Sequence, residues 1–324
     1  MKLTNKHNLP LSVAAWLVHD NYEYASDPNY ISVTTLLKPI KQIILGRRIE
    51  FSTVEQDIMD LFAVRLGQSL HDSIEHVWQN YAREDLEKLG INQATLDRMS
   101  INGDNPMDNV INITMENRIK KTVGKWTVSG KYDFNSNGQL EDFKSVPAFS
   151  YLKQSNREQY IQQGSIYRWL DPSIVTEETI QINYLIKDWK KFEAKRDREY
   201  PSTPIKISHY PLWSVEQTDA WVKNRLAAIE KYMDLPEEQI PECNEEELWR
   251  KPPIYKYFKN PDAARSTANF SNYGEAIQKQ LENNGAGIIK TVGGEVKRCH
   301  YCNAFTACQQ KNNYLADGSL KLEE

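Results

Sequence analysis

The sequence predicts an α/β fold, in which a central mixed β-sheet is flanked by helices. Strand-like segments, rich in β-branched and aromatic residues, occur at residues 110–115, 126–134, 139–146, 179–186 and 205–212. Segments with apolar residues at helical spacing occur at residues 52–82, 157–170 and 215–233. Because the two kinds of segment are interspersed along the chain, the strands are expected to share one sheet that the helices cover.

The composition is that of a globular protein whose charge is close to balanced. The 324 residues, 40% hydrophobic and 26% charged, are enough for one large or two modest domains. No apolar run is long enough to span a bilayer and no signal-peptide core follows the first residues, so we expect a cytoplasmic protein without a membrane partner. The net charge of −4 excludes a globally basic nucleic-acid binder but is compatible with a local basic groove.

The helix expected at residues 52–82 carries the first candidate ligand. Ser52 and Glu55 have the spacing of a capping box at its start. His71 lies one turn from Gly67 and one turn from Glu75, so these three residues share a helix face. A lone histidine on an apolar helix is usually a satisfied core residue, so His71 becomes a candidate only through the residues that follow.

Residues 126–134 and 139–146 are expected to form a hairpin, because the turn between them contains an Asn-Gly pair that favours positive φ. Side chains alternate along a strand, so Asp142 and Lys144 point to one face. Asp133, on the preceding strand, can meet them across the hairpin. The sequence therefore predicts two carboxylates and a lysine at one edge of the sheet.

These groups suit the hydrolysis of a phosphodiester. Carboxylates bind Mg²⁺ or Mn²⁺, and the metal polarises the phosphodiester and lowers the pKa of a bound water. The lysine can orient or deprotonate that water, or stabilise the developing charge. The backbone carbonyl of Phe143 could supply a further ligand. Taken alone, however, Asp-x-Lys is a short and nonspecific motif, because surface strands often carry alternating charges.

The neighbouring elements make the motif more specific. Gln163 and Tyr167 lie one turn apart on the helix at residues 157–170, where the ordinary alternative is a surface pair. Four elements in order resemble the RecB-like branch of the PD-(D/E)XK nucleases: Gly67 to His71, Gly130 to Asp133, Asp142 to Lys144, and Gln163 to Tyr167. The resemblance covers roughly residues 30–310 and is nearest to phage-encoded RecB-like exonucleases that have a C-terminal cysteine cluster.

This resemblance implies a fold and a set of roles. The fold is a restriction-endonuclease-like core at residues 1–240, including an N-terminal helical part, followed by a cysteine-cluster extension at 241–310 and a polar tail at 311–324. The implied metal ligands are His71, Asp133, Asp142 and the Phe143 carbonyl. Lys144 is the implied catalytic lysine. Gln163 and Tyr167 are implied to position the scissile phosphate, with Glu75 as a supporting group behind the ligands.

The cysteines form a second candidate site. Cys299, Cys302 and Cys308 have a C-x2-C-x5-C spacing, and Cys243 can complete a set of four thiolates. Four thiolates suit either a [4Fe–4S] cluster or Zn²⁺, and the resemblance favours [4Fe–4S]. The layout departs from the commonest one in that family, because Cys243 follows the nuclease core rather than preceding it. The expected role is to staple the C-terminal segment onto the core.

The expected activity is hydrolysis of DNA with Mg²⁺ or Mn²⁺. We expect an exonuclease acting without sequence specificity on single strands or duplex ends, in phage DNA replication, recombination or degradation, with replication or recombination proteins as partners. Basic residues at 118–125 and 187–198 could follow the phosphate backbone, although such runs are usually solvated faces. The alternatives are a structure-specific flap or branch endonuclease and a catalytically inactive DNA-binding scaffold on the same fold.

Overall fold

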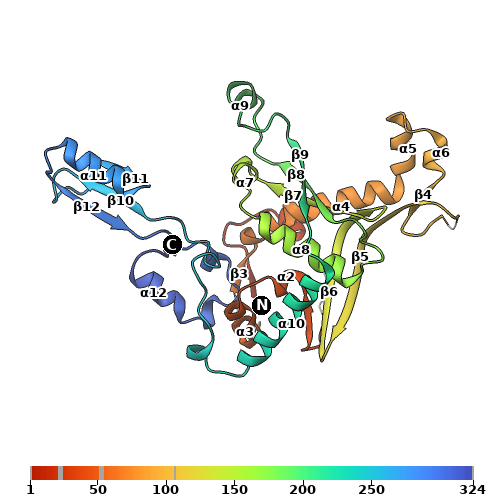
Figure 1. The fold of residues 1–324 in the computed structure, drawn as a ribbon, viewed down its shortest axis with the longest axis horizontal. Coiled ribbons are helices and arrows are strands. Elements are labelled where there is room, and N and C mark those ends of the chain that lie inside the picture. The colour runs from red at the N-terminus through yellow and green to blue at the C-terminus, as the bar shows by residue number, and fades with distance from the viewer. Residues whose placement is uncertain (1, 21–24, 51–54, 106, 323–324) are drawn as a thin grey trace. The chain divides into compact units, whose positions relative to one another are not determined.

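The structure, a computed structural model, describes residues 2–20, 25–50, 55–105 and 107–322. It divides into two compact units, the first at residues 1–37 and 50–227 and the second at residues 38–49 and 228–324 (Figure 1). The expected boundary was at residue 240. The division instead lies within the long helix α10 (Val215–Tyr232), and an N-terminal helix, α3 (Ile40–Arg48), belongs to the second unit.

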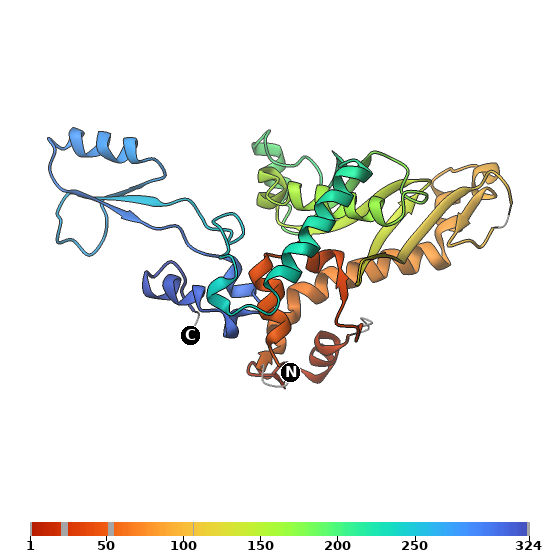
Figure 2. The ribbon, with the colours of Figure 1, turned by 60° about the horizontal axis from the view of Figure 1, so that its bottom comes forward.

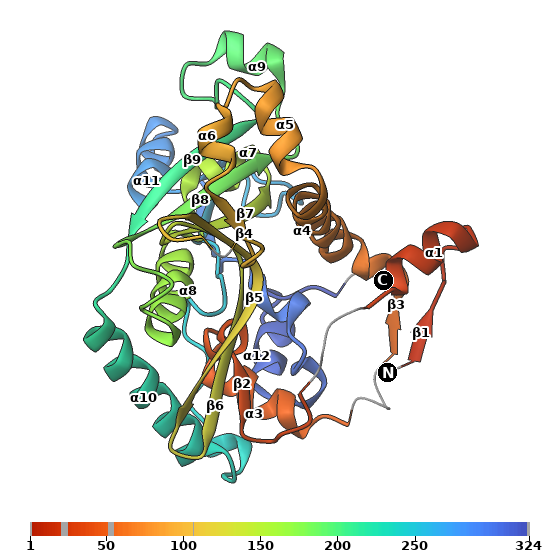
Figure 3. The ribbon, with the colours of Figure 1, turned by 90° about the vertical axis from the view of Figure 1, so that its right-hand side faces the viewer.

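The first unit is built on a seven-stranded mixed sheet. Its strands are, in order, β4 (Met99–Ile101), β5 (Ile111–Val123), β6 (Trp126–Ser136), β7 (Gln139–Val146), β8 (Thr179–Ile186) and β9 (Ile205–Pro211), with β2 (Tyr30–Ser32) pairing with β6. The pairs β4–β5, β2–β6 and β7–β8 are parallel, and the others are antiparallel. The sheet is curled (Figure 3), and the predicted mixed α/β architecture is confirmed.

One edge of β6 divides between two partners. β7 pairs only with the end of β6, from Phe134 to Ser136, whereas β2 pairs with Thr127 to Ser129. Residues 130–133 of β6 lie between these two ladders and are paired with neither β2 nor β7. Asp133, at the point where β6 and β7 separate, therefore has space beside it for side-chain contacts.

Helices cover the sheet and position the candidate residues. α8 (Arg157–Leu170) packs against β5, β6, β8 and β9, and α4 (Phe62–Asn80) contacts β7. Two glycines bring α8 close: a Cβ on Gly130 would lie 2.4 Å from the Tyr167 ring, and one on Gly164 would lie 2.8 Å from Leu212. The shorter helices of this unit are α1 (Leu11–Val18), α2 (Val33–Leu36), α5 (Ala82–Lys88), α6 (Gln93–Leu96), α7 (Ala148–Lys153) and α9 (Lys191–Arg196).

The helix predicted at residues 52–82 is wrong at its start. β3 (Glu55–Asp57) and the 3-10 helix η2 (Ile58–Leu61) precede α4, and Ser52 lies outside the described residues. β3 pairs in parallel with β1 (Lys2–Thr4), and the Asp57 side chain accepts a hydrogen bond from the Met59 amide at the start of η2. A pairing across about fifty residues is invisible to local periodicity, which explains the error.

The second unit contains a small antiparallel sheet with the strand order β11 (Ala268–Phe270), β10 (Ile254–Phe258), β12 (Ile288–Val292), contacted by α11 (Tyr273–Glu282) (Figure 2). Its remaining elements are the 3-10 helices η3 (Glu237–Gln239), η4 (Arg298–Tyr301) and η5 (Phe305–Ala307) and the helix α12 (Gln310–Ala316). A separate core of Ile44, Leu45, Ile240 and Ala304 includes the partly buried Cys302 and Cys308. The segment expected to be a polar tail thus begins inside α12 and includes the buried Leu320.

No helix in the described part of the chain has both the length and the apolar character needed to cross a membrane.

Candidate metal centre and catalytic residues

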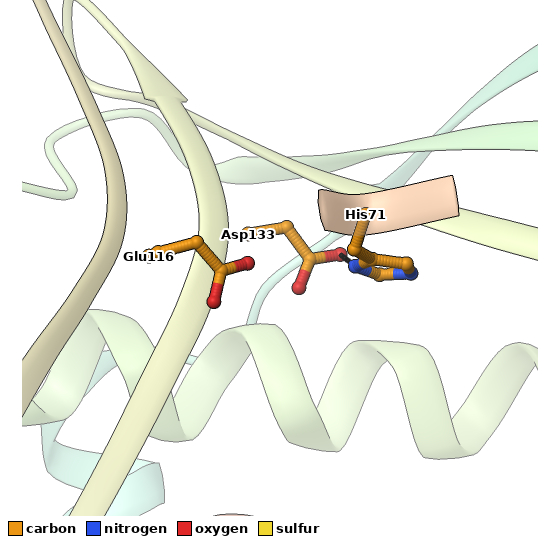
Figure 4. Close-up of side chains that lie close together, drawn as sticks. All are labelled: His71, Glu116 and Asp133. Atoms are coloured by element: carbon orange, nitrogen blue, oxygen red, sulfur yellow. Dashed lines mark ion pairs between the residues drawn. The ribbon is translucent and has the colours of Figure 1, made fainter. Parts of the chain in front are cut away.

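Three side chains from three elements meet where β6 leaves β7. They are His71 on α4, Glu116 on β5 and Asp133 on β6, and their ligand atoms all lie within 4.8 Å of one another (Figure 4). The His71 Nδ1 is 3.3 Å from the Asp133 Oδ2. Two carboxylates and an imidazole at this spacing form a donor set for a divalent cation.

Glu116 was not predicted from the sequence. The register flanking it pairs Met115 with Phe134 and Asn117 with Tyr132, which places Glu116 opposite Asp133. Its φ of 50° is unusual for a residue other than glycine, and its carboxylate forms an ion pair with Lys131. The sequence did contain a signal for Glu116. The two-residue turn between Val123 and Trp126 sets the register of the β5–β6 hairpin, and that register places Glu116 opposite Asp133.

A second group lies on β7 and α8. The Lys144 Nζ is 2.6 Å from the Asp142 Oδ2, and the Gln163 amide donates a hydrogen bond of 3.3 Å to the Asp142 Oδ1. Asp142 is only 2% exposed. Its Oδ2 has no aligned hydrogen-bond donor among the described residues, so the nearby ammonium charge is its main compensation. A buried carboxylate oxygen with incomplete hydrogen bonding has room in its coordination for a cation.

The backbone of Phe143 links the two groups. Its amide donates a hydrogen bond of 3.0 Å to the Asp133 Oδ2. The N–H and C=O of one strand residue point to the same side of the strand, so the Phe143 carbonyl also faces the gap between β7 and β6. The implied ligand carbonyl therefore lies on the side of β7 that Asp133 occupies.

Gln163 and Tyr167 are 8% and 3% exposed, and both make hydrogen bonds inside the protein. Gln163 donates to the Tyr167 hydroxyl at 3.2 Å as well as to Asp142. The Tyr167 hydroxyl donates to the Lys131 carbonyl at 3.0 Å. In this structure they hold Asp142 and β6 in place, and their contact with a phosphate stays a prediction.

The protonation states follow from burial and from the neighbouring charges. Burial raises the pKa of Asp142 to about 6, although Lys144 opposes the shift. Burial alone would lower the pKa of Lys144, but Asp142 and Asp133 outweigh it and raise that pKa. In the same way, burial lowers the pKa of His71 and the hydrogen bond to Asp133 more than restores it, so the net shift is upward. Lys144 is therefore a cation at neutral pH.

The residues present fit a hard divalent cation. The trio offers carboxylate oxygens and an imidazole nitrogen. The predicted ligand Asp142 lies outside the group within 4.8 Å, although its buried Oδ2 has no aligned donor among the described residues. Glu75 lines the same small pocket as His71, Glu116 and Asp133, and it accepts a hydrogen bond from Gln79. Its oxygens are not in the group within 4.8 Å, and its supporting role stays a prediction.

The four cysteines all line one pocket in the second unit. They share it with Lys41, Gln42, Leu45, Leu248, Arg298, Ala304, Gln310 and Tyr314. Burial, followed by repulsion from Glu247 and from the other thiolates, raises the pKa of Cys243 to about 12. Burial, followed by repulsion from Cys302 and Cys308, raises the pKa of Cys299 to about 11. Gathered half-buried thiols ionise at neutral pH only with a compensating cation, so the donor set fits a metal or a cluster.

No protein-family model and no curated protein matches the chain. The solved structures similar to it include one titled "Crystal structure of SSO0001", with 14% sequence identity and a TM-score of 0.40. That match covers 66% of this chain and 81% of the other. A likeness of this size adds no argument for fold or function, which depend here on the residues and their geometry.

Proposed function

We propose that this protein is a metal-dependent DNA nuclease of the RecB-like PD-(D/E)XK type. The observation that carries the proposal is the meeting of the His71, Glu116 and Asp133 trio with the Asp142–Lys144 pair at the opening between β6 and β7. The preferred activity is that of an exonuclease on single-stranded DNA or duplex ends.

The residues divide the chemistry between them. A divalent cation bound here would polarise the scissile phosphate and lower the pKa of a bound water. His71, Glu116, Asp133 and Asp142 would hold it, with the Phe143 carbonyl as a further ligand. Lys144 is a partly buried cation with a raised pKa, which favours charge stabilisation of the phosphorane over proton abstraction. Gln163 fixes the rotamer of Asp142, and Tyr167 fixes β6 beside Asp133.

A [4Fe–4S] cluster in the second unit is part of the proposal. The four cysteines line one pocket, and four thiolates suit either such a cluster or Zn²⁺. The C-x2-C-x5-C spacing of Cys299, Cys302 and Cys308 resembles that of iron–sulfur RecB-like nucleases, which favours the cluster.

The test is a digestion panel of single-stranded, blunt, overhanging, flapped and circular DNA with Mg²⁺ or Mn²⁺. We expect degradation that needs a free end, with product sizes falling over time. Cleavage of circular DNA or a single cut at a flap would instead indicate an endonuclease. An absence of cleavage with either metal over a range of ionic strengths would contradict the proposal.

Lys144→Ala should abolish cleavage and retain DNA binding, because it removes the charge that stabilises the transition state. Lys223→Ala is the matched control, since Lys223 also pairs with an aspartate but lies on the exposed face of α10. Cleavage rates and oligonucleotide binding are measured for both variants. Full activity in Lys144→Ala would overturn the assignment of this lysine.

A further inference from the structure

Two short helices leave the sheet at the same end. β7 and β8 are parallel, so the segments that follow them, α7 and α9, both start at the carboxyl edge of these strands. The Ala148 amide donates a hydrogen bond of 2.6 Å to the Asp188 carboxylate, which joins the start of α7 to the turn after β8. The two helices thus lie at the same end of the sheet (Figure 1), and the exposed residues of α7 and α9 with their flanking segments are called the α7–α9 surface.

Each helix exposes a phenylalanine at its second position. Phe149 on α7 is 66% exposed and Phe192 on α9 is 69% exposed. The Arg196 guanidinium lies 5.7 Å from the Phe192 ring centroid. Both rings are therefore accessible for stacking on a ligand.

The same surface is basic in an acidic protein. Residues 187–198 contain six Lys or Arg and three Asp or Glu, a net charge of +3, and residues 148–157 contain Lys153 and Arg157 and no acid, a net charge of +2. The sum of +5 leaves −9 for the rest of the chain, whose total is −4. All eight basic side chains are exposed. The surface that carries the two phenylalanines therefore attracts a polyanion.

A row of aromatic contacts connects this surface to the candidate catalytic lysine. The Lys144 Nζ lies 5.5 Å from the Tyr160 ring centroid. The centroids of Tyr160 and Tyr184 are 6.1 Å apart, and those of Tyr184 and Tyr151 on α7 are 5.2 Å apart. α7 is thus packed on the same tyrosine cluster that contacts Lys144.

We infer that α7 and α9 form a binding surface for an unpaired nucleic-acid strand leading to or from Lys144, an inference that rests on the proposed nuclease function. Phe149 and Phe192 would stack on bases, and the lysines and arginines would contact phosphates. Unpaired bases expose the ring faces that such stacking needs. A purely apolar protein partner would leave the five excess positive charges without a role.

The experiment measures binding of a fluorescent single-stranded oligonucleotide to the full chain without divalent metal, so that cleavage does not interfere. Phe149→Ala with Phe192→Ala should weaken binding at least about tenfold, and Phe149→Tyr with Phe192→Tyr should restore it. Leu89→Ala is the control, because Leu89 is 79% exposed on another part of the first unit. Lys191→Ala with Lys195→Ala should lower the salt slope by roughly 1.4.

Duplex DNA of the same sequence is the second arm, and the phenylalanine variants should change its binding little. Equal single-strand binding by wild type and the alanine variants would overturn the inference, as would an equal loss of duplex binding. Cleavage by wild type is assayed separately. If the wild type cleaves DNA but the phenylalanine variants bind as well as it does, the nuclease proposal stands and the binding surface is wrong. If the variants lose binding but the wild type cleaves no DNA, the binding surface stands and the nuclease proposal is wrong.

Discussion

Each carboxylate of the candidate site named here lies next to one basic side chain. His71 pairs with Asp133, Lys144 with Asp142, and Lys131 with Glu116. A bound divalent metal ion would neutralise part of the carboxylate charge that His71, Lys144 and Lys131 compensate in its absence. The positive φ of Glu116 costs on the order of 1–3 kcal/mol, and backbone strain of this kind clusters at functional sites.

Metal affinity should depend on pH through three of these residues. The pKa of Asp142 is raised to about 6, that of His71 above its usual 6.5 and that of Glu116 above its usual 4.5, so all three bind protons as the pH falls. The metal must displace those protons, and the Mn²⁺ affinity should therefore drop, with a slope of log Kd against pH that steepens, as the pH falls. Calorimetric titration from pH 5 to 8 measures it.

His71→Gln is the control for this slope, because glutamine has no proton to lose in this range. Its slope should be smaller by about one, the proton that His71 contributes in the wild type. A wild-type affinity that does not change between pH 5 and 8 would show that none of the three residues binds the metal.

Glu116→Gln should weaken Mn²⁺ binding by roughly ten- to a hundredfold, because a neutral amide replaces one carboxylate of the trio. Glu75→Gln removes the same charge from the same pocket but lies outside the trio, so it should have a smaller effect. Titration of both variants compares them directly. Equal effects would mean that Glu116 contributes only its charge and not a ligand atom.

At the scale of elements, the site depends on how two strands separate and how one helix approaches. β6 diverges from β7 after a short ladder, and the Asp133 carboxylate fills the gap by accepting from the Phe143 amide. α8 lies close to β6 because Gly130 has no side chain to hold the Tyr167 ring away. The spacing between α8 and the sheet therefore decides whether Gln163 reaches Asp142.

Gly130→Ala should destabilise the protein by about 1–3 kcal/mol, because the added Cβ would lie 2.4 Å from Tyr167 and 2.8 Å from Val33. Gly67→Ala should stabilise it by roughly 0.5–1 kcal/mol, since nothing lies within 4 Å of that Cβ in the middle of α4. Chemical denaturation measures both changes. A stabilised Gly130→Ala would contradict the close approach of α8.

At the scale of the whole molecule, the chain builds two units from interleaved segments. Residues 38–49 fold with the C-terminal part although the first unit surrounds them in sequence. The second unit has a small core of its own and a three-stranded sheet, and its four cysteines line one pocket within it. A small core of this kind gains stability from a bound metal or cluster, whose binding energy acts as folding energy.

The protein purified without air should therefore be brown and absorb near roughly 400 nm. Cys243→Ser should lose the colour and make the second unit more sensitive to proteolysis. His300→Ala should keep both properties, because His300 is exposed between Cys299 and Cys302. Iron, sulfide and zinc analysis accompanies the spectra, and a colourless protein with one equivalent of zinc would overturn the cluster.

The elements with a strong local pattern could be predicted from the sequence alone. β7, α8 and β8 have the bounds that alternation and helical spacing predict, and strand alternation alone put Asp142 on the same face as Lys144. These features follow from side-chain direction along a regular backbone, which neighbouring residues specify.

The way in which distant segments meet could not be predicted from local patterns. The β1–β3 pairing shortened the predicted helix, residues 38–49 joined the second unit, and Glu116 joined His71 and Asp133. Glu116 was within reach of register reasoning, but its approach to His71 depends on where α4 packs. Contacts between remote elements depend on burial and close packing summed over the whole chain, and no local pattern contains that sum.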